Sequence, residues 1–552
     1  MLKENLVNSF EKSFKNNWNK PCFSDYEKDF ETFGEIAAKI KKIHSLFETI
    51  DLKEGDKVAV AGKNSVNWGI AYLATVTYGA VIVPILSDFA DAEIEHIVSH
   101  SESKLFFVAD LIFNRLNLES MQGLKAVFSI DNFKVLHNSN DKITKDLEMF
   151  EENFALKKEF FPEDFSFKEV ASDKLASIVY TSGTTGFSKG VMLSHNCLMA
   201  NVQFFLNYLP VSSDNCVVSF LPLAHSFGCA FDFLSPVVKG CHIIFLGRIP
   251  SPNTIIKAFN KEKPVVIFAV PLILEKIYRA KIMPLIQSKK MKILLNIPVI
   301  KNIIMKKIGK GINEAFGGDH YEVVVGGAAF NPEIEEFFMK AGVKVTVGYG
   351  MTECGPLISY WDYYKGRPVG SCGKVIDYLD IKIDNPDEHG VGEICVKGEN
   401  IMDGYYKMEE ETAEAIDSEG WLHTGDLAHI DKDGFIFISG RSKNMILSSS
   451  GQNIYPEEIE AKINFMPFVS ESLVLDAGNG RLVAFVYPDK GEIAKNNISN
   501  EELLDIMQEN RAKLNEILPV FARVMEIKIH EEEFEKTSTK KIKRRLYTHL
   551  VG

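Results

Sequence analysis

Short apolar runs, each closed by glycine, proline or charged residues, recur along the first half of the chain. They are Lys57 to Ala61, Leu105 to Ala109, Val217 to Leu221, His242 to Leu246 and Val265 to Val270. Apolar runs this short are typical of strands that are buried on both faces. Helical patterns such as Ala92 to His100 separate several of them. The alternation predicts an α/β fold in which helices cover largely parallel sheets on both sides.

An uncharged stretch from Trp68 to Leu86 has the length of a membrane span. Threonines, Gly79 and Pro84 interrupt it. This pattern favours a buried helix that ends near Gly79, followed by a core strand over Val81 to Ile85. Residues 132–172 are richer in charge and in phenylalanine, and we expect them to form a surface excursion.

A glycine-rich segment, Tyr180 to Val191, follows the apolar run Leu175 to Tyr180 and precedes a predicted helix start over Met192 to Gln203. Its sequence is Tyr-Thr-Ser-Gly-Thr-Thr-Gly-Phe-Ser-Lys-Gly-Val. Glycines let the backbone approach a ligand, and amide, hydroxyl and lysine donors favour an anion. The spacing differs from the Walker pattern, in which lysine directly follows glycine. Taken alone, the segment fits a phosphate-holding loop and a plain surface loop equally well.

Composition narrows the class of protein. A chain of 552 residues is too long for one core, so at least two domains are expected. The net charge of −13 argues against a general nucleic-acid binder. The eight cysteines include no Cys-x-x-Cys pair, which favours reduced, mostly buried thiols in a cytoplasmic protein over disulfides or a zinc site. No apolar run typical of a signal peptide follows Met1.

Cations and apolar residues alternate over residues 276–316, in a chain that is otherwise acidic. The cations are Lys276, Arg279, Lys281, Lys289, Lys290, Lys292, Lys301, Lys306, Lys307 and Lys310. No acidic residue lies between Glu275 and Glu314. A basic amphipathic helix on a membrane surface and a solvated helix face are two interpretations of equal weight.

Polar side chains follow the next predicted strands, at the ends where open α/β sheets bind ligands. Tyr321 to Ala328 is a strand that runs into a glycine turn, and Lys344 to Val347 is followed by Gly-Tyr-Gly-Met-Thr-Glu. There Tyr349 can stack on a base, Thr352 can donate to a phosphate and Glu353 can hold Mg²⁺. A buried tyrosine beside a capping Thr-Glu pair is the alternative.

Two later segments add candidate ligands for a nucleotide. Gly-Trp-Leu-His-Thr-Gly-Asp at 420–426 ends in a carboxylate suited to two ribose hydroxyls, although a turn aspartate is the ordinary interpretation. Gly434 to Arg441 is a predicted strand that ends in a second candidate contact. Beyond Lys443, a helix over Pro456 to Lys462 and a hairpin over Glu471 to Tyr487 predict a small α+β domain.

Six ordered segments resemble the adenylate-forming superfamily, which includes acyl-CoA synthetases, luciferases and the adenylation domains of peptide synthetases. They are 180–191, 221–228, 323–328, 348–353, 420–426 with 440–443, and 537–544. Segment 420–426 and residues 270–278 are most similar to long-chain fatty acyl-CoA synthetases. The family usually has proline at the position of Ser188 and glycine at that of Lys540.

The resemblance implies a large N-terminal AMP-binding domain over 1–440, made of helix-covered sheets and a small β-barrel-like part. A hinge at 441–443 and a small mobile α+β domain over 444–552 complete the expected chain. Mg²⁺ and ATP would convert a medium- or long-chain fatty acid into an acyl-adenylate, from which coenzyme A takes the acyl group. The expected partners are these small molecules and no nucleic acid; the oligomeric state stays open. The expected location is cytoplasmic, with peripheral contact at the inner membrane face through 276–316 as the open alternative.

The resemblance also implies roles for single residues. Lys541, Glu353 and Thr184 are the expected catalytic residues, and Glu353 is the expected Mg²⁺ ligand. The phosphate-binding set is Thr181, Ser182, Gly183, Thr184, Thr185, Gly186, Lys189 and Thr352. The adenosine-binding set is Gly326, Gly327, Ala328, Tyr349, Gly350, Asp426 and Arg441. His225, Phe227 and Gly228 line the acyl pocket, Lys443 is the hinge, and Gly451 faces the coenzyme A tunnel.

Two rival functions remain. A fatty acyl-AMP ligase or acyl-carrier-protein synthetase, which loads the phosphopantetheine of a carrier protein, would share all of these segments. A non-catalytic nucleotide-binding relative is the remoter alternative, because the residues expected to act are all present. Outside the family context, a structural histidine is the ordinary interpretation of His225.

Overall fold

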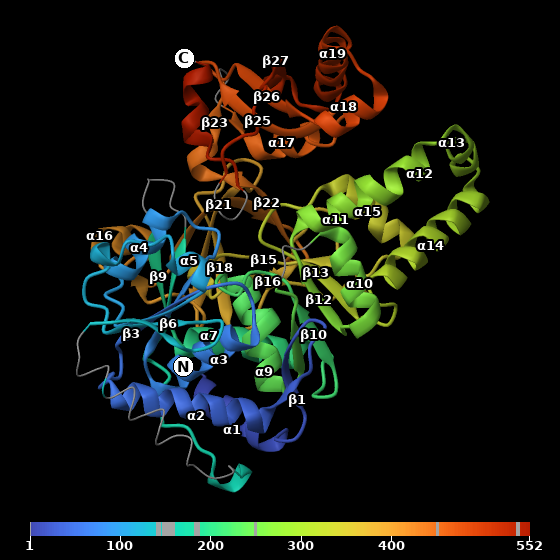
Figure 1. The fold of residues 1–552 in the computed structure, drawn as a ribbon. Coiled ribbons are helices and arrows are strands. Elements are labelled where there is room, and N and C mark those ends of the chain that lie inside the picture. The colour runs from blue at the N-terminus through green and yellow to red at the C-terminus, as the bar shows by residue number, and fades with distance from the viewer. Residues whose placement is uncertain are drawn as a thin grey trace. The chain divides into compact units, whose positions relative to one another are not determined.

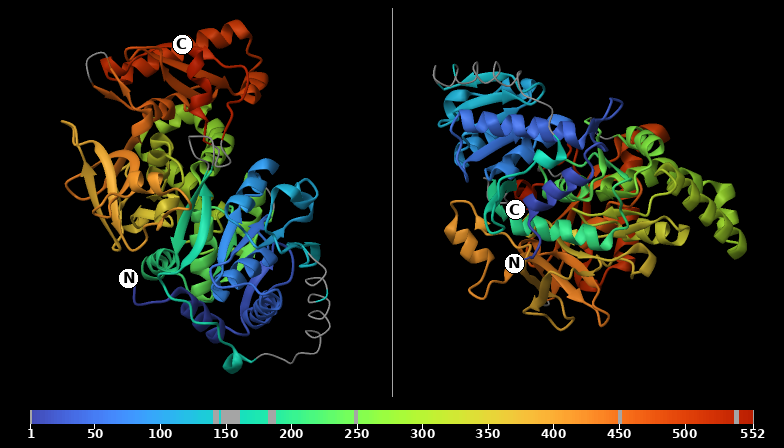
Figure 2. Two further views of the ribbon diagram at one scale, coloured as in Figure 1. Left: turned by 90° about the vertical axis from the view of Figure 1, so that its left-hand side faces the viewer. Right: turned by 90° about the horizontal axis from the view of Figure 1, so that it is seen from below.

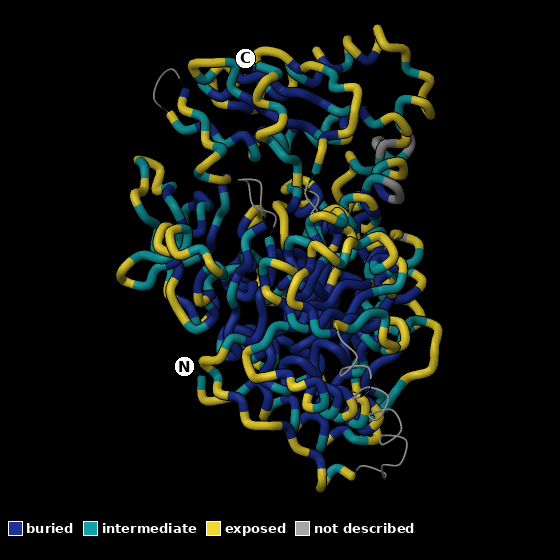
Figure 3. Tube along the Cα trace, turned by 60° about the vertical axis from the view of Figure 1, so that its left-hand side comes forward, coloured by how far each residue is buried: buried dark blue, intermediate teal, exposed yellow. Residues whose placement is uncertain are grey.

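The structure, a computed structural model, describes residues 2–139, 145, 161–181, 188–247, 251–448, 452–536 and 541–551 (Figures 1 and 2). These residues form two compact units. The described residues of the first unit are those up to Thr181, Ser188–Asp380 and Lys397–Leu422. Those of the second are Ile381–Val396 and the chain from His423 onward. Each unit has its own apolar core, drawn in dark blue in Figure 3.

An eight-stranded sheet is the largest sheet of the first unit. In spatial order its strands are β20 (Gly404–Tyr405), β9 (Lys189–Ser194), β8 (Leu175–Thr181), β4 (Val81–Ile85), β3 (Lys57–Ala61), β5 (Leu105–Val108), β6 (Ala126–Ser129) and β7 (Val135–Asn138). Strands β8 to β6 run parallel, and the outer strands are antiparallel to their neighbours. Because β4 and β5 are apolar throughout, they are buried at every position. The predicted parallel sheet is confirmed.

The uncharged stretch that begins at Trp68 forms a helix and a strand. Helix α3 (Val66–Tyr78) begins where the Ser65 hydroxyl accepts from the Trp68 N–H, and it ends at Gly79 with a left-handed φ of 88°. Glycine adopts this conformation without a Cβ clash. The predicted buried helix and core strand are therefore confirmed. Within the described ranges, no helix is long and apolar enough to cross a membrane.

Three smaller sheets lie in the described part of the first unit. The first is β10 (Cys216–Ser219), β11 (His242–Phe245), β1 (Pro21–Asp25) and β2 (Glu31–Thr32). The second, parallel throughout, is β12 (Val266–Ala269), β13 (Glu322–Val325) and β14 (Val345–Val347). The third is β15 (Tyr349–Gly350), β16 (Leu357–Tyr360) and β17 (Lys374–Val375). The apolar runs predicted near residues 217, 242 and 265 are thus all strands.

Helices surround these sheets. They are α1 (Leu6–Asn16), α2 (Phe33–Thr49), α4 (Asp91–His100), α5 (Asp110–Phe113), α7 (His195–Tyr208), α8 (Ser226–Gly228), α9 (Ser235–Lys239), α10 (Pro252–Glu262), α11 (Pro271–Ile277), α15 (Pro332–Ala341) and α16 (Glu409–Ala415). Three further helices, α12 (Met283–Gln287), α13 (Lys289–Leu295) and α14 (Pro298–Ala315), form a projection beyond α10 and α11 that we call the helical arm (residues 283–315; Figure 1). The predicted basic helical region is therefore helical.

Most residues of a four-stranded sheet belong to the second unit. Its strands, in spatial order, are β18 (Leu379–Asp384), β19 (Gly392–Gly398), β21 (Leu422–Ile430) and β22 (Ile436–Arg441). A second sheet contains β25 (Val469–Asp476), β26 (Leu482–Pro488) and β27 (Val524–Ile529), with helices α17 (Pro456–Ile463), α18 (Lys490–Asn496) and α19 (Asn500–Ile517). Strands β23 (Ile446–Leu447) and β24 (Asn453–Ile454) pair separately. The predicted α+β content, with its helix after residue 455 and its hairpin, is confirmed.

Two predictions were wrong. Met192 lies in β9 and not in a helix, and α7 begins only at His195 after the Ser194 cap. The reason is long-range pairing, because β9 lies between β8 and β20. The surface excursion is also wrong at its end, where Phe165 is completely buried and stacks on Phe14 with ring centres 5.8 Å apart. About half of the expected excursion, residues 140–144 and 146–160, lies outside the described residues.

Candidate active site

The predicted phosphate loop joins two antiparallel strands. Thr181 ends β8 directly opposite Lys189, which begins β9, and the Thr181 hydroxyl donates to the Lys189 carbonyl at 3.5 Å. This pairing holds the two ends of the loop side by side. The predicted phosphate-binding residues inside the loop lie outside the described residues: Ser182, Gly183, Thr184, Thr185 and Gly186.

Ser188, at a position where the superfamily usually has proline, is tied to helix α4. Its hydroxyl donates to Glu93 Oε1 at 2.6 Å, and the residue is buried. Proline has no hydroxyl and could not make this bond. In this chain a side-chain hydrogen bond therefore restrains the position at which the family pattern has the rigid ring of proline.

A tyrosine that was not singled out in the sequence, Tyr405, contacts both Lys189 and Glu353. The pairing of β20 with β9 places Tyr405 opposite Val191. The Tyr405 hydroxyl donates to Glu353 Oε1 at 2.8 Å, and Lys189 Nζ lies 4.7 Å from the centre of the Tyr405 ring. An ammonium group is attracted to the face of an aromatic ring. The available signal was Gly-Tyr-Tyr at 404–406, but nothing in the sequence shows that it pairs with β9.

The carboxyl ends of β13 and β14 lie side by side, as predicted for a ligand-binding edge. Val325 is opposite Val347, and Gly326 and Gly348 follow them. A Cβ added to Gly326 would lie 3.3 Å from Phe227 Cζ. The segment predicted to bind adenosine and the segment predicted to line the acyl pocket are therefore in contact, and Gly327 and Ala328 follow as exposed residues.

Tyr349 and Gly350 form β15, which runs antiparallel to β16. A Cβ at Gly350 would lie 2.0 Å from the Pro356 carbonyl oxygen, so only glycine fits there. Thr352 opens the next turn, and its hydroxyl accepts from Ser226 Oγ at 3.4 Å. This contact joins the predicted phosphate ligand Thr352 to the turn that contains His225.

The three predicted acyl-pocket residues lie in one tight turn. His225 caps α8, and its Nδ1 accepts from the Phe227 N–H at 3.3 Å. A Cβ at Gly228 would lie 2.6 Å from the Pro222 carbonyl oxygen, which requires glycine. The Phe227 ring packs edge-on against Phe268, with ring centres 6.0 Å apart.

Glu353 and Thr352 offer the hard oxygen atoms that Mg²⁺ prefers. The hydrogen bond from Tyr405 to Oε1 orients the whole Glu353 carboxylate, including Oε2. Proteins commonly hold Mg²⁺ with one or two carboxylates plus phosphate oxygens and water. The donor set therefore fits the predicted ion.

Asp426 and Arg441 form a cross-strand pair in the second unit. Strands β21 and β22 place them opposite each other, and Arg441 Nε lies 2.7 Å from Asp426 Oδ1. The Asp426 side chain is 7% exposed and that of Arg441 is 46% exposed. The Asp426 N–H donates to Thr424 Oγ1 at 3.1 Å. The buried carboxylate is thus fixed in direction, and the arginine keeps an accessible face.

Lys443 and Lys541 are both exposed residues of the second unit. Lys443 lies in the turn Ser442–Asn444 that follows Arg441. Gly451, predicted for the coenzyme A tunnel, and Lys540, which departs from the family pattern, lie outside the described residues.

An ion pair anchors the segment that contains Lys541. Arg544 Nη2 lies 2.7 and 2.9 Å from the two carboxylate oxygens of Glu460, and Nη1 donates to the Val474 carbonyl at 2.6 Å. Burial raises the pKa of Glu460 to about 7, although Arg544 opposes that shift. The basic segment is therefore fixed to helix α17 and strand β25 three residues after Lys541.

All eight cysteines lie in the described part of the chain, and none forms a disulfide. Seven are buried and Cys216 is half-buried. Burial raises the pKa of Cys216 to about 11 and those of Cys229 and Cys241 to about 12. The predicted burial of most thiols is confirmed.

Comparison with known proteins relates these features to a family. A family model described as AMP-binding enzyme matches residues 10–406, and one described as AMP-binding enzyme C-terminal domain matches residues 443–550. Among similar proteins, the human long-chain-fatty-acid–CoA ligase ACSBG2 is 28% identical over 477 residues, which cover 81% of this chain and 70% of that protein. The Drosophila melanogaster long-chain-fatty-acid–CoA ligase heimdall is 28% identical over 481 residues, with coverages of 80% and 69%.

Solved structures share the fold. ATP-bound MatB from Rhodopseudomonas palustris superposes with a TM-score of 0.76 at 23% identity, covering 100% of both chains. The anthranilate CoA ligase AuaEII in complex with anthranoyl-AMP gives a TM-score of 0.79 at 18% identity, covering 100% of this chain and 98% of that one. At these identities the likeness shows the α/β fold with a large N-terminal and a small C-terminal part.

Proposed function

Because the chain belongs to the family of AMP-binding enzymes, we propose that it is an ATP-dependent, AMP-forming fatty acyl-CoA ligase. Its substrate is a medium- or long-chain carboxylic acid, in keeping with the long-chain-fatty-acid–CoA ligases that resemble it. The observation that supports this best is the contact chain Lys189–Tyr405–Glu353 in the first unit. The contacts of Thr352 with Ser226 and of Gly326 with Phe227 give further support, because they join the predicted nucleotide and acyl segments.

The proposed reaction has two steps. A fatty carboxylate oxygen attacks the α-phosphorus of ATP, the new O–P bond forms, and pyrophosphate leaves. The thiol sulfur of coenzyme A then attacks the acyl carbon and forms the C–S bond. The bond between the acyl carbon and the phosphate oxygen breaks, AMP leaves with the electron pair, and the thiol proton passes to solvent. The first step brings two anions together, so fixed cations and donors must offset their repulsion.

The side chains of the first unit suit that task. Lys189 supplies positive charge beside the phosphate loop, while Thr352 supplies a hydroxyl donor. Glu353, oriented by Tyr405, would hold Mg²⁺ together with phosphate oxygens. Bound there, Mg²⁺ would neutralise phosphate charge. Tyr349 would stack on the adenine, beside the glycine turn at 326–328.

Asp426 and Arg441 would bind the ribose. The Asp426 carboxylate can accept from both ribose hydroxyls, and Arg441 holds it in place while donating from its exposed face. A pair that is already formed costs little ordering entropy on binding. Replacing either residue should therefore raise the KM for ATP.

We propose a large domain over 1–440, a hinge at 441–443 around Lys443, and a small domain over 444–552. The C-terminal family model, which begins at residue 443, supports this division, whereas the second compact unit also includes 381–396 and 423–440. Lys541 would bridge the carboxylate and the α-phosphate in the first step. Hinge residues absorb large φ/ψ changes, and an exposed turn such as Ser442–Asn444 can do so. The second step would follow rotation of the small domain, with Gly451 facing coenzyme A.

Separate half-reactions test the role of Lys541. Lys541→Ala should reduce pyrophosphate release by about a hundredfold or more, since a charge acting in the transition state is lost. It should leave thioester formation from supplied acyl-AMP and coenzyme A within a few-fold of the wild-type rate. Lys543→Ala is the matched control, because Lys543 pairs with Glu535 in the same segment. Equal loss of both half-reactions would contradict the proposed role.

A panel of fatty acids tests the function itself. Pyrophosphate release should depend on acids of medium or long chain, and the acyl product should appear on coenzyme A. If a carrier protein accepts the acyl group and coenzyme A does not, the chain is an acyl-AMP ligase or carrier-protein synthetase. Binding of ATP without any carboxylate-dependent pyrophosphate would identify a non-catalytic relative.

The helical arm supports a peripheral membrane contact in addition. Val299 is 71% exposed, Ile293 67% and Ile303 62%, and exposed Lys301 and Lys306 lie among them. Exposed apolar side chains between lysines fit an anionic lipid surface. The apolar side chains would enter the interface, and the lysines would contact the anionic headgroups. The contact would bring the enzyme to a membrane that contains its fatty acid. Retention on anionic vesicles at low ionic strength, and no retention on neutral ones, is the expected result.

A further inference from the structure

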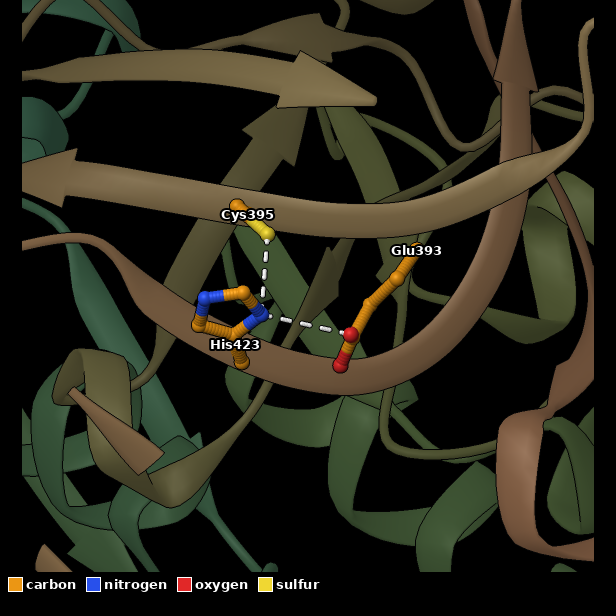
Figure 4. A group of neighbouring side chains, drawn as sticks. All are labelled: Glu393, Cys395 and His423. Atoms are coloured by element: carbon orange, nitrogen blue, oxygen red, sulfur yellow. Dashed lines mark hydrogen bonds and ion pairs between the residues drawn. The ribbon is translucent and has the colours of Figure 1, made fainter. Parts of the chain in front are cut away.

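Three potential metal ligands meet on the sheet of the second unit (Figure 4). Glu393 and Cys395 lie two residues apart on β19, so their side chains leave the same face of that strand. His423 lies on the neighbouring strand β21. Figure 4 shows the thiol and the carboxylate both pointing at the imidazole of His423.

The distances between the three groups also suit ligation of a common ion. His423 Nδ1 lies 3.3 Å from Cys395 Sγ and 3.3 Å from Glu393 Oε2, and all three ligand atoms lie within 4.8 Å of one another. A ring nitrogen either donates one proton or accepts one, so Nδ1 cannot serve both neighbours equally. Ligands around a tetrahedral Zn²⁺, with its usual bond lengths, lie roughly 3.3–3.6 Å apart. The two distances from His423 Nδ1 fall at the lower end of that range, and the distance between the thiol and the carboxylate is at most 4.8 Å.

Neighbouring groups hold the ligands in this arrangement. The Gly425 N–H donates to Glu393 Oε1 at 2.7 Å, which turns Oε2 toward His423. The Thr424 hydroxyl donates to the Ile394 carbonyl at 2.8 Å and fastens β21 to β19. Hydrogen bonds to the second carboxylate oxygen are a common support of metal sites. About a quarter of each of the Glu393 and His423 side chains is exposed, 28% and 27%, which gives an ion a path to the buried thiol.

We propose that Glu393, Cys395 and His423 bind a divalent cation of the zinc class, with water as the fourth ligand. One thiolate, one carboxylate and one neutral imidazole match the charge and softness that Zn²⁺ prefers. Binding releases the thiol proton of Cys395 to solvent, because thiolate is the ligand form. The absence of Cys-x-x-Cys spacing argued against a zinc site, but here the ligands come from two strands that are distant in sequence. The proposal does not depend on the enzymatic activity.

Cobalt titration of the whole chain tests the site. The metal-free protein is titrated with Co²⁺, which reports thiolate ligation by a sulfur-to-metal charge-transfer band and four-coordination by intense visible bands. One equivalent should bind, and Zn²⁺ should displace it. Zn²⁺ should also raise the melting temperature, since a ligand that binds only the folded state stabilises it.

Matched variants locate the ion. Cys395→Ser should abolish the charge-transfer band, while Glu393→Gln and His423→Gln should weaken binding by at least about tenfold, the lower end of the loss seen when even a supporting residue is removed. His429→Gln, on the same strand, and Cys372→Ser, another buried thiol, should bind as the wild type does. Thermal melts establish whether each variant folds. If Cys395→Ser does not fold, Co²⁺ binding by Glu393→Gln, at a partly exposed position, decides the test. No charge-transfer band in the wild type, or one that persists in Cys395→Ser, overturns the proposal.

Discussion

Tyr405 links the two charged side chains that flank the proposed phosphate site. In Tyr405→Phe the ring stays beneath Lys189, and only the hydroxyl that donates to Glu353 is lost. A hydrogen bond to a charged group contributes about 1.5–3 kcal/mol, so kcat/KM for Mg·ATP in pyrophosphate release should fall by about tenfold to a hundredfold.

The control for this change is Tyr406→Phe. That hydroxyl donates to Glu102 at 3.1 Å on an exposed part of the first unit, and its loss should leave the rate unchanged. If Tyr405→Phe matches Tyr406→Phe, Tyr405 does not position Glu353.

Candidate site residues could be recognised where their chemistry follows local sequence. Lys189 and Glu353 stand out because each is a charged residue close to glycines in a segment that follows a predicted strand. Tyr405 does not, because its partners depend on the pairing of β20 with β9. The same applies to Ser188, whose bond to Glu93 joins residues that are 95 positions apart.

At the scale of elements, a neutral histidine lies between helices α2 and α3. His44 Nε2 lies 2.9 Å from the Ala74 carbonyl oxygen, and burial lowers the pKa of His44 to about 3, with nearby Lys41 adding to the effect. The unfolded chain, with an ordinary pKa near 6.5, takes up the proton first as pH falls. The stability due to neutral His44 is therefore fully present above pH ~6.5 and is lost progressively as pH falls toward 3.

His44→Gln should flatten the acid dependence of stability. Between pH 7 and pH 5 the wild-type free energy of unfolding should fall by about 2 kcal/mol more than that of the variant, which cannot be protonated. Glutamine can still donate to the Ala74 carbonyl. Urea unfolding at both pH values measures the difference, and parallel pH dependence in the two proteins would contradict the assignment.

The Arg544–Glu460 pair should matter for the second unit as a whole. Arg544→Gln leaves the mostly buried Glu460 carboxylate without its cation, which should lower stability by about 3 kcal/mol. In the double variant with Glu460→Gln, no buried charge remains, and a large part of the loss should return. Thermal melts and limited proteolysis of the second unit report the effect. A double variant no more stable than Arg544→Gln would mean that lost packing is responsible.

Elements were predictable where burial alone determines them. The strands β3, β4 and β5 are apolar at nearly every position and lie in the middle of a sheet. Strand β9 was mistaken for a helix start, because the residues Gly-Val-Met-Leu-Ser show no clear period. Its strand conformation depends on β8 and β20, which lie on either side of it.

At the scale of the whole molecule, the distribution of charge is uneven. The chain has a net charge of −13, yet residues 276–313 contain no acidic side chain. Reversing two exposed charges of the helical arm, Lys301→Glu and Lys306→Glu, should abolish retention on anionic vesicles, since each lysine near such a surface contributes about 1 kcal/mol. Sedimentation with vesicles at low ionic strength measures it.

A matched control distinguishes the effect of where the charges are reversed from the effect of the change in net charge. Lys432→Glu with Lys495→Glu makes the same total change at exposed positions of the second unit. This control should keep vesicle binding. If both double variants lose it equally, overall charge and not the helical arm governs retention.

The order of the six segments allowed the family to be recognised from sequence, and composition indicated more than one domain. The contacts inside the candidate site could not be predicted, because they join residues from strands far apart in the chain.

The burial of seven of the eight thiols has a practical consequence. With the pKa of several raised by burial, little thiolate is present at neutral pH to react with maleimides. A cysteine introduced at the exposed position of Ile293 would therefore take up a fluorophore almost alone. We therefore expect little background labelling of the natural chain. A dye at that position would report the polarity around the helical arm.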